Sequence, residues 1–137
     1  MILVDTNVLI DILGDDPDHR EWSQRELDRA LINHQLAINP VVYAEISPPY
    51  ATEAALDEVL AIMKISIEPM STRALFLAGK AHHAYRRRGG AQPRALPDFL
   101  VGAQATALDV ALITRDVSRY RTYFPKLRLI APAENRK

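Results

Sequence analysis

The feature that most constrains the fold is a repeated alternation between short apolar runs and longer amphipathic stretches. Apolar runs of three residues stand at positions 2–4 and 36–38, and two further strand-like segments, at 65–67 and 111–114, each contain one hydroxyl residue. Short, continuously apolar runs are typical of parallel strands that are buried on both faces. Because helix-like segments separate them, we predict an α/β fold, a three-layer α/β/α sandwich around a central parallel sheet, with a last strand at 127–130.

The helices of this fold are predicted from caps, breakers and helical periodicity. Asp16 and Pro17 are typical of an N-cap and a first helical residue. Prolines at 48–49 end one helix, and glycines at 89–90 end another. The predicted helices cover residues 8–13, 17–34, 40–46, 55–63, 72–88, 97–107 and 117–123.

The size and composition of the chain indicate one folded unit. Its 137 residues predict a single domain over 1–137, with 48% hydrophobic and 25% charged residues. The absence of cysteine excludes disulfide scaffolds and thiolate metal sites. The N-terminus has no basic region and reaches a charge at Asp5, which predicts neither a signal peptide nor a membrane span. We therefore expect a cytoplasmic protein without membrane contact.

Four acidic residues stand where the chemistry of such a fold is expected. Ligand sites of open α/β sheets lie beyond the carboxyl ends of the strands. Asp5 follows the first strand and Asp116 follows the fourth, so neighbouring strands would bring these two side chains together. Asp98 lies in the first turn of a predicted helix, and Glu45 lies within the apolar segment 41–46.

Each acid also has a purely structural interpretation. Asp5, Asp98 and Asp116 stand where carboxylates cap helices or meet the positive end of the helix dipole. Glu45 could be exposed on a helix, because burial of an unpaired charge is costly. If the four converge, they repel one another, and a divalent cation removes that repulsion. Because Mg²⁺ and Mn²⁺ prefer oxygen ligands, an all-acid site favours one of these metals and phosphodiester hydrolysis.

Four segments resemble the motifs of PIN domains, and in particular of the VapC-type toxins of bacterial toxin–antitoxin pairs. They are MILVDTNVLI at 1–10, AEI at 44–46, LPDFLVGA at 96–103 and LITRD at 112–116. Their order and spacing extend through nearly the whole chain. The resemblance implies a PIN-like fold, dependence on Mg²⁺ or Mn²⁺, cleavage of an RNA substrate and a small cognate antitoxin protein as partner.

The resemblance also assigns roles to individual residues. Matched position by position, it gives metal-binding and catalytic roles to Asp5, Glu45, Asp98 and Asp116. Asn7 and Thr114 match polar positions that support the acids, although they could equally satisfy local backbone groups. Apolar residues on the early helices suit an antitoxin groove or a homodimer interface as well as a core, and we expect a homodimer.

Binding of RNA must depend on local charge, because the formal net charge of the chain is zero. The basic residues that we consider for RNA contact are Arg86, Arg87, Arg88, Arg94 and Arg115. The first three end a predicted helix, where the dipole favours cations with or without RNA. His82 and His83 are adjacent and diverge on a helix, so they cannot chelate one metal together.

Three other functions fit the predicted fold. A receiver domain would need an acceptor Asp after the third strand, which instead continues into Glu68 and Pro69. A haloacid-dehalogenase-like phosphatase would need a second acid where Asn7 stands. A catalytically silent RNA- or protein-binding module remains the alternative to the main prediction. That prediction is a metal-dependent endoribonuclease, the toxin of a toxin–antitoxin pair.

Overall fold

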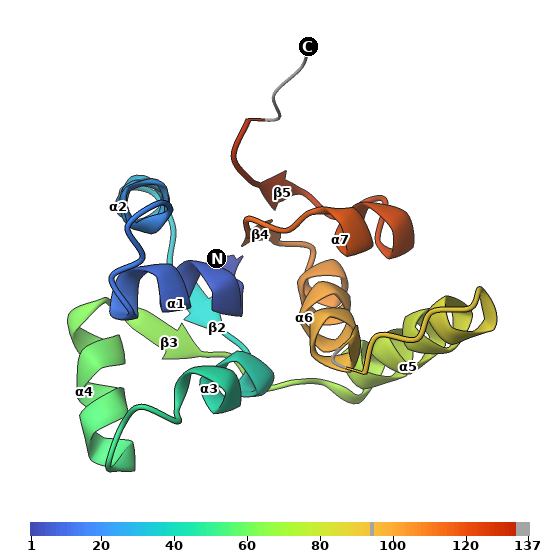
Figure 1. Cartoon of the computed structure of the whole chain (residues 1–137), viewed down its shortest axis with the longest axis horizontal. Coiled ribbons are helices and arrows are strands. Elements are labelled where there is room, and N and C mark those ends of the chain that lie inside the picture. The colour runs from blue at the N-terminus through green and yellow to red at the C-terminus, as the bar shows by residue number, and fades with distance from the viewer. Residues whose placement is uncertain (94, 134–137) are drawn as a thin grey trace.

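The computed structural model describes residues 1–93 and 95–133, which form seven helices and a five-stranded parallel sheet (Figure 1). The strands are β1 (Ile2–Val4), β2 (Leu36–Ile38), β3 (Ile65–Ile67), β4 (Ala111–Ile113) and β5 (Leu129–Ile130). All five coincide with predicted strands, and the last two are shorter than predicted by one and two residues. The predicted parallel sheet is therefore confirmed.

The order of the strands reverses direction at the centre of the sheet. The order is β3-β2-β1-β4-β5, and every neighbouring pair is parallel. The chain moves outward from β1 through β2 to β3, then returns to the other side of β1 for β4 and β5. In the register of the central pair, Val4 lies opposite Ile113. This reversal between β1 and β4 is the topological switch point at which open α/β sheets bind ligands.

Helices cover both faces of the sheet. They are α1 (Thr6–Leu13), α2 (Arg20–Leu31), α3 (Pro40–Ile46), α4 (Glu53–Ile62), α5 (Thr72–Arg87), α6 (Ala95–Leu108) and α7 (Ser118–Tyr123). Helix α1 packs on α2, and α5 packs on α6, which also contacts α7 and β4. Figure 1 shows α5, α6 and α7 to the right of the strands, and α2 on the other side of the molecule, above β3. The predicted three-layer α/β/α sandwich is confirmed.

Five helices (α1, α2, α4, α6 and α7) begin one to three residues away from the predicted residue, and the reasons are clearest for α2 and α6. Helix α2 begins at Arg20, because the Asp16 carboxylate accepts hydrogen bonds from the backbone N–H groups of Asp18 and His19 and closes a separate turn before the helix. Helix α6 begins at Ala95, two residues earlier than predicted. Pro97 fits within its first turn, where a helix needs no backbone N–H donor.

The core lies directly beneath the carboxyl ends of the central strands. All residues of β1 and β2 are buried, whereas Ser66 and Ile67 of the edge strand β3 are exposed. On α6, Gly102 allows close contact with α7, because an added Cβ would lie 2.6 Å from a ring carbon of Phe124. Among the described helices, none combines the length and apolar character needed to cross a membrane.

Candidate active site

Asp5 lies at the end of β1 and is also the N-cap of α1. Its Oδ1 accepts a hydrogen bond from the backbone N–H of Thr6 at 2.8 Å. Its Oδ2 accepts from the hydroxyls of Thr114, at 2.9 Å, and Tyr120, at 2.7 Å. The residue is only 5% exposed. Both carboxylate oxygens of Asp5 therefore accept hydrogen bonds from fixed donors. Asp5 caps α1 and is also part of the candidate site.

The electrostatic state of Asp5 reflects a balance between burial and these hydrogen bonds. Burial raises the pKa of Asp5 most strongly, and the nearby charge of Glu45 raises it further. The hydrogen bonds from Tyr120, Thr114 and Thr6 lower that pKa, because they stabilise the carboxylate. The net direction is upward, as expected for a buried anion that lacks a full positive partner.

Asn7 and Thr114 connect this acid to the loop after β4. The Asn7 amide Nδ2 donates to the Thr114 hydroxyl at 3.2 Å and lies 3.4 Å from Oδ2 of Asp5. The amide oxygen of Asn7 accepts from the backbone N–H of Arg115 at 3.1 Å. Asn7 therefore contacts Asp5 and also satisfies a backbone group. Both roles considered for Asn7, support of the acid and a local backbone contact, are present in the structure.

Asp98 approaches the same edge of the sheet from the first turn of α6. It is partly buried, and its Oδ2 accepts a hydrogen bond from Nη1 of Arg119 on α7. Burial and then the charge of Asp5 raise the pKa of Asp98 to about 6, and Asp116 adds to the rise. The Arg119 guanidinium opposes this rise. Asp98 therefore lies in the combined field of Asp5 and Asp116.

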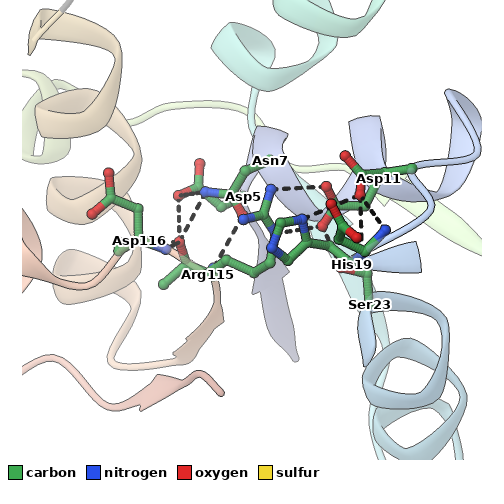
Figure 2. A network of polar contacts seen from close by, with 10 residues as sticks. Asp5, Asn7, Asp11, His19, Ser23, Arg115 and Asp116 are labelled. Atoms are coloured by element: carbon green, nitrogen blue, oxygen red, sulfur yellow. Dashed lines mark hydrogen bonds and ion pairs between the residues drawn. The ribbon is translucent and has the colours of Figure 1, made fainter. Parts of the chain in front are cut away.

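Glu45 and Asp116 are the exposed acids of the group. Glu45, on α3, accepts a hydrogen bond at Oε1 from the Thr6 hydroxyl at 2.7 Å. The backbone N–H of Asp116 donates to the Thr114 hydroxyl at 3.2 Å. Figure 2 shows Asp116 on one side of Asp5, with its carboxylate directed away from the Arg115 side chain. The other three acids are thus linked to Asp5: Glu45 and Asp98 through its electrostatic field, and Asp116 through the Thr114 hydroxyl.

The chemistry of this group fits a hard divalent cation. Its members offer only oxygen ligands, which Mg²⁺ and Mn²⁺ prefer, and the two more buried acids have raised pKa values that a cation would reverse. Among the described residues, however, the ligand atoms that lie within 4.8 Å of one another in a group of three belong to Asp11, Asp16 and His19. The four acids are thus spaced more widely than that group.

The tighter group is a poorer candidate, because Asp11 already has a cationic partner. Nε of Arg115 lies 2.5 Å from Oδ2 of Asp11, and Nη2 lies 2.8 Å from Oδ1. The Ser23 hydroxyl donates to the same carboxylate at 2.7 Å (Figure 2). Asp11 is 1% exposed, so this bidentate pair ties the loop after β4 to α1 and α2. The predicted RNA contact of Arg115 stays a prediction, with two of its nitrogens engaged by Asp11.

The other basic candidates lie at the end of α5. Arg86, Arg87 and Arg88 are exposed, and the guanidinium of Arg88 lies 5.7 Å from the centre of the Tyr123 ring. Arg94 lies outside the described residues. The predicted RNA contacts of these arginines stay predictions.

Three contributors to the site were missed by sequence reasoning. Tyr120 and Arg119 lie on the short helix α7. No feature of the sequence indicates which side of this helix faces Asp5 and Asp98. Asp11 did have a signal, because it interrupts the apolar segment VLIDIL of α1. A carboxylate on the buried face of a helix requires a cation or several donors, and Arg115 supplies the cation.

Comparison with a family model relates the sequence to known proteins. The model described as PIN domain matches residues 2–125. A search of curated proteins found no significant match.

Solved structures with the same fold include three toxin–antitoxin complexes. VapBC2 from Rickettsia felis, bound to a DNA fragment from its promoter, gives a TM-score of 0.73 at 21% identity, over 97% of this chain and 100% of the other. VapBC-1 from nontypeable Haemophilus influenzae gives 0.72 at 18%, over 96% and 98% of the two chains. A complex from Klebsiella pneumoniae gives 0.70 at 23%, over 98% and 99%. At these identities the likeness shows the fold alone.

Proposed function

The chain belongs to the PIN domain family, and we propose that it is a metal-dependent endoribonuclease that acts as the toxin of a toxin–antitoxin pair. The observation that supports the proposal is the electrostatic coupling of Asp98 to Asp5 and Asp116, two acids that follow the neighbouring strands β1 and β4. Burial, and after it the charges of Asp5 and Asp116, raise the pKa of Asp98 to about 6, although the Arg119 guanidinium opposes the rise. A binding module would gain nothing from such crowding, whereas a metal-dependent nuclease requires it.

In this proposal, Asp5, Asp98 and Asp116 hold Mg²⁺ or Mn²⁺, and Glu45 is a further ligand or orients water. A divalent cation bound there would lower the pKa of a water molecule and stabilise negative charge on a phosphodiester. Hydrolysis forms a bond from the water oxygen to phosphorus and breaks the bond from phosphorus to one ribose oxygen. Four carboxylates without a histidine or cysteine are a ligand set suited to Mg²⁺ or Mn²⁺ rather than to Zn²⁺.

The residues around the acids fix them in place before substrate binds. Thr114, Tyr120 and the backbone of Thr6 leave Asp5 little rotational freedom. Glu45 is exposed and fixed at one oxygen by Thr6, so its second oxygen is available to orient the attacking water and accept its proton. Preorganisation of this kind reduces the reorganisation needed in the transition state.

A partner for the proposed toxin is suggested by the solved complexes. The Klebsiella pneumoniae structure is described as a toxin–antitoxin complex, and its fold covers 98% of this chain. By extension, we propose a small antitoxin protein as partner, RNA as substrate, a homodimeric assembly and a cytoplasmic location. A catalytically silent RNA- or protein-binding module on the same fold is the competing proposal, and activity measurements separate the two.

The test compares RNA cleavage by the wild type and by Asp116→Asn in Mg²⁺, in Mn²⁺ and in EDTA. Asp28→Asn is the matched control, because Asp28 is an exposed acid on α2. We expect cleavage by the wild type and the control with either metal, and none in EDTA or by Asp116→Asn. Undiminished cleavage in EDTA would refute metal dependence. The absence of cleavage by the wild type on a broad RNA pool, with metal bound, would favour the silent module.

A further inference from the structure

The cations of this neutral chain are strongly segregated along the sequence. Residues 69–97 contain six Lys and Arg residues and no Asp or Glu. Residues 117–133 contain four Lys and Arg residues and again no acid. The first stretch contains α5 and the second contains α7, which both pack beside α6. Although the net charge of the chain is zero, the region of α5 and α7 is therefore strongly basic.

A groove of 660 Å³ lies between these two basic stretches. Its cationic lining residues are Lys80 on α5, Arg88 at the C-cap of α5 and Lys126 in the segment after α7. Tyr123 and Phe124 contribute aromatic rings to the same groove, and no residue that lines it is acidic. Lys80 and Lys126 are exposed, so their charges are available to a ligand in the groove.

A cluster of rings connects this groove to the acids of the candidate active site. Arg119, which donates to Asp98, lies 5.3 Å from the centre of the Tyr85 ring. The Tyr85 and Tyr123 rings are 5.9 Å apart, and Arg88 lies over Tyr123. Arg119 and Tyr123 are separated by one turn of α7, so they lie on the same side of that helix. The groove thus begins one turn along α7 from Arg119, the residue that donates to Asp98.

We infer that the groove between α5 and α7 binds single-stranded RNA adjacent to the phosphodiester that is cleaved. Single strands are held by cations that contact phosphates and by aromatic rings on which bases stack, and the groove offers both. A regular duplex would not present its bases to Tyr123. An acidic protein segment would match the charge, but it would not require continuity with the catalytic acids. The choice of RNA as ligand, and of a position beside the cleaved phosphodiester, rests on the proposed nuclease function. The binding of a single strand to the groove does not itself require cleavage.

The experiment measures RNA binding separately from cleavage. The ligand is a fluorescein-labelled single-stranded RNA of mixed sequence, titrated with the full chain in EDTA and followed by fluorescence anisotropy. The groove variant is Lys80→Gln/Arg88→Gln/Lys126→Gln. The control variant, Arg20→Gln/Arg25→Gln/Arg29→Gln, removes the same charge from exposed positions on α2. A duplex of the same sequence and an acidic peptide serve as competitors, and sedimentation gives the oligomeric state.

We expect the groove variant to bind the single strand at least roughly tenfold more weakly than the wild type, and the control variant to bind within about twofold. The slope of log K against log salt concentration should fall by about 2, because each phosphate contact to a single strand contributes roughly 0.7. The duplex and the acidic peptide should compete poorly.

Four results would overturn the inference. They are equal binding by the groove and control variants, no RNA binding by the wild type, preferential competition by the duplex or the peptide, and conversion of a dimer to a monomer by the groove substitutions alone. The proposed function is tested separately by cleavage in Mg²⁺. If the groove binds RNA but the wild type does not cleave it, the nuclease proposal fails and the groove inference stands. If the wild type cleaves but the groove variant binds normally, only the groove inference fails.

Discussion

Substitution of Arg115 by Met should destabilise the protein strongly, because it removes the cationic partner of a buried acid. Asp11 is 1% exposed, and both of its oxygens accept from Arg115. Without Arg115, the described partner that remains for this carboxylate is the Ser23 hydroxyl. Removal of one member of a buried pair costs about 3–5 kcal/mol of unfolding free energy. Because the Arg115 side chain is 25% exposed, we expect about 3 kcal/mol, near the lower end.

The assay is urea denaturation of the metal-free protein, followed by circular dichroism. The control is Arg20→Met, since the side chains of Arg20 and its partner Asp15 are 47% and 86% exposed, and this substitution should cost about 1 kcal/mol or less. The double variant Asp11→Leu/Arg115→Met should recover much of the loss, because it leaves no buried charge unpaired. A loss below about 1 kcal/mol for Arg115→Met, or no recovery in the double variant, would refute this reasoning.

Three further predictions concern the site and its support. Tyr120→Phe removes a hydrogen bond to buried Asp5 and should lower the unfolding free energy by about 1–3 kcal/mol, measured by urea denaturation. The metal-free wild type should lose stability as pH rises from about 4 to about 6, because the pKa of Asp98 is raised in the folded state. Over this range the native state still holds the proton that the unfolded state releases. Asp98→Asn should flatten this dependence of the unfolding free energy on pH, and an unchanged pH profile would contradict the prediction. Gly102→Ala forces a Cβ against the Phe124 ring and should cost about 1–3 kcal/mol, seen as a lower Tm.

Much of the fold could be predicted because its strands are short and buried on both faces. Runs such as Ile2–Val4 and Leu36–Ile38 carry no polar residue, and the structure buries every residue of both. The alternation of strands and helices then implied a parallel sheet covered by helices on both faces. These two facts place Asp5 and Asp116 at the same edge of the sheet, and the structure pairs β1 with β4 as expected.

The contacts among side chains could not be predicted in the same way. The hydrogen bonds of Tyr120 to Asp5 and of Arg119 to Asp98 depend on how α7 is rotated about its axis relative to β1 and α6. A helix of six residues has too short a pattern to fix that rotation. The bidentate pairing of Arg115 with Asp11 joins residues 104 positions apart. Sequence reasoning therefore predicted the positions of the acids in the fold, but not the hydroxyl and guanidinium groups that contact them.

The proposed function requires that Asp5, Asp98 and Asp116 together bind a divalent cation, and Mn²⁺ binding measured by isothermal titration calorimetry tests this requirement most directly. The proteins compared are the wild type, Asp98→Asn, the surface control Asp28→Asn and Asp16→Asn, which alters the second acidic group. We predict that Asp98→Asn weakens Mn²⁺ binding by at least roughly tenfold, a cost within the range for perturbed metal sites, and that the other two bind like the wild type. Normal binding by Asp98→Asn, with loss of binding in Asp16→Asn, would assign the cation to Asp11, Asp16 and His19 and contradict the proposed function.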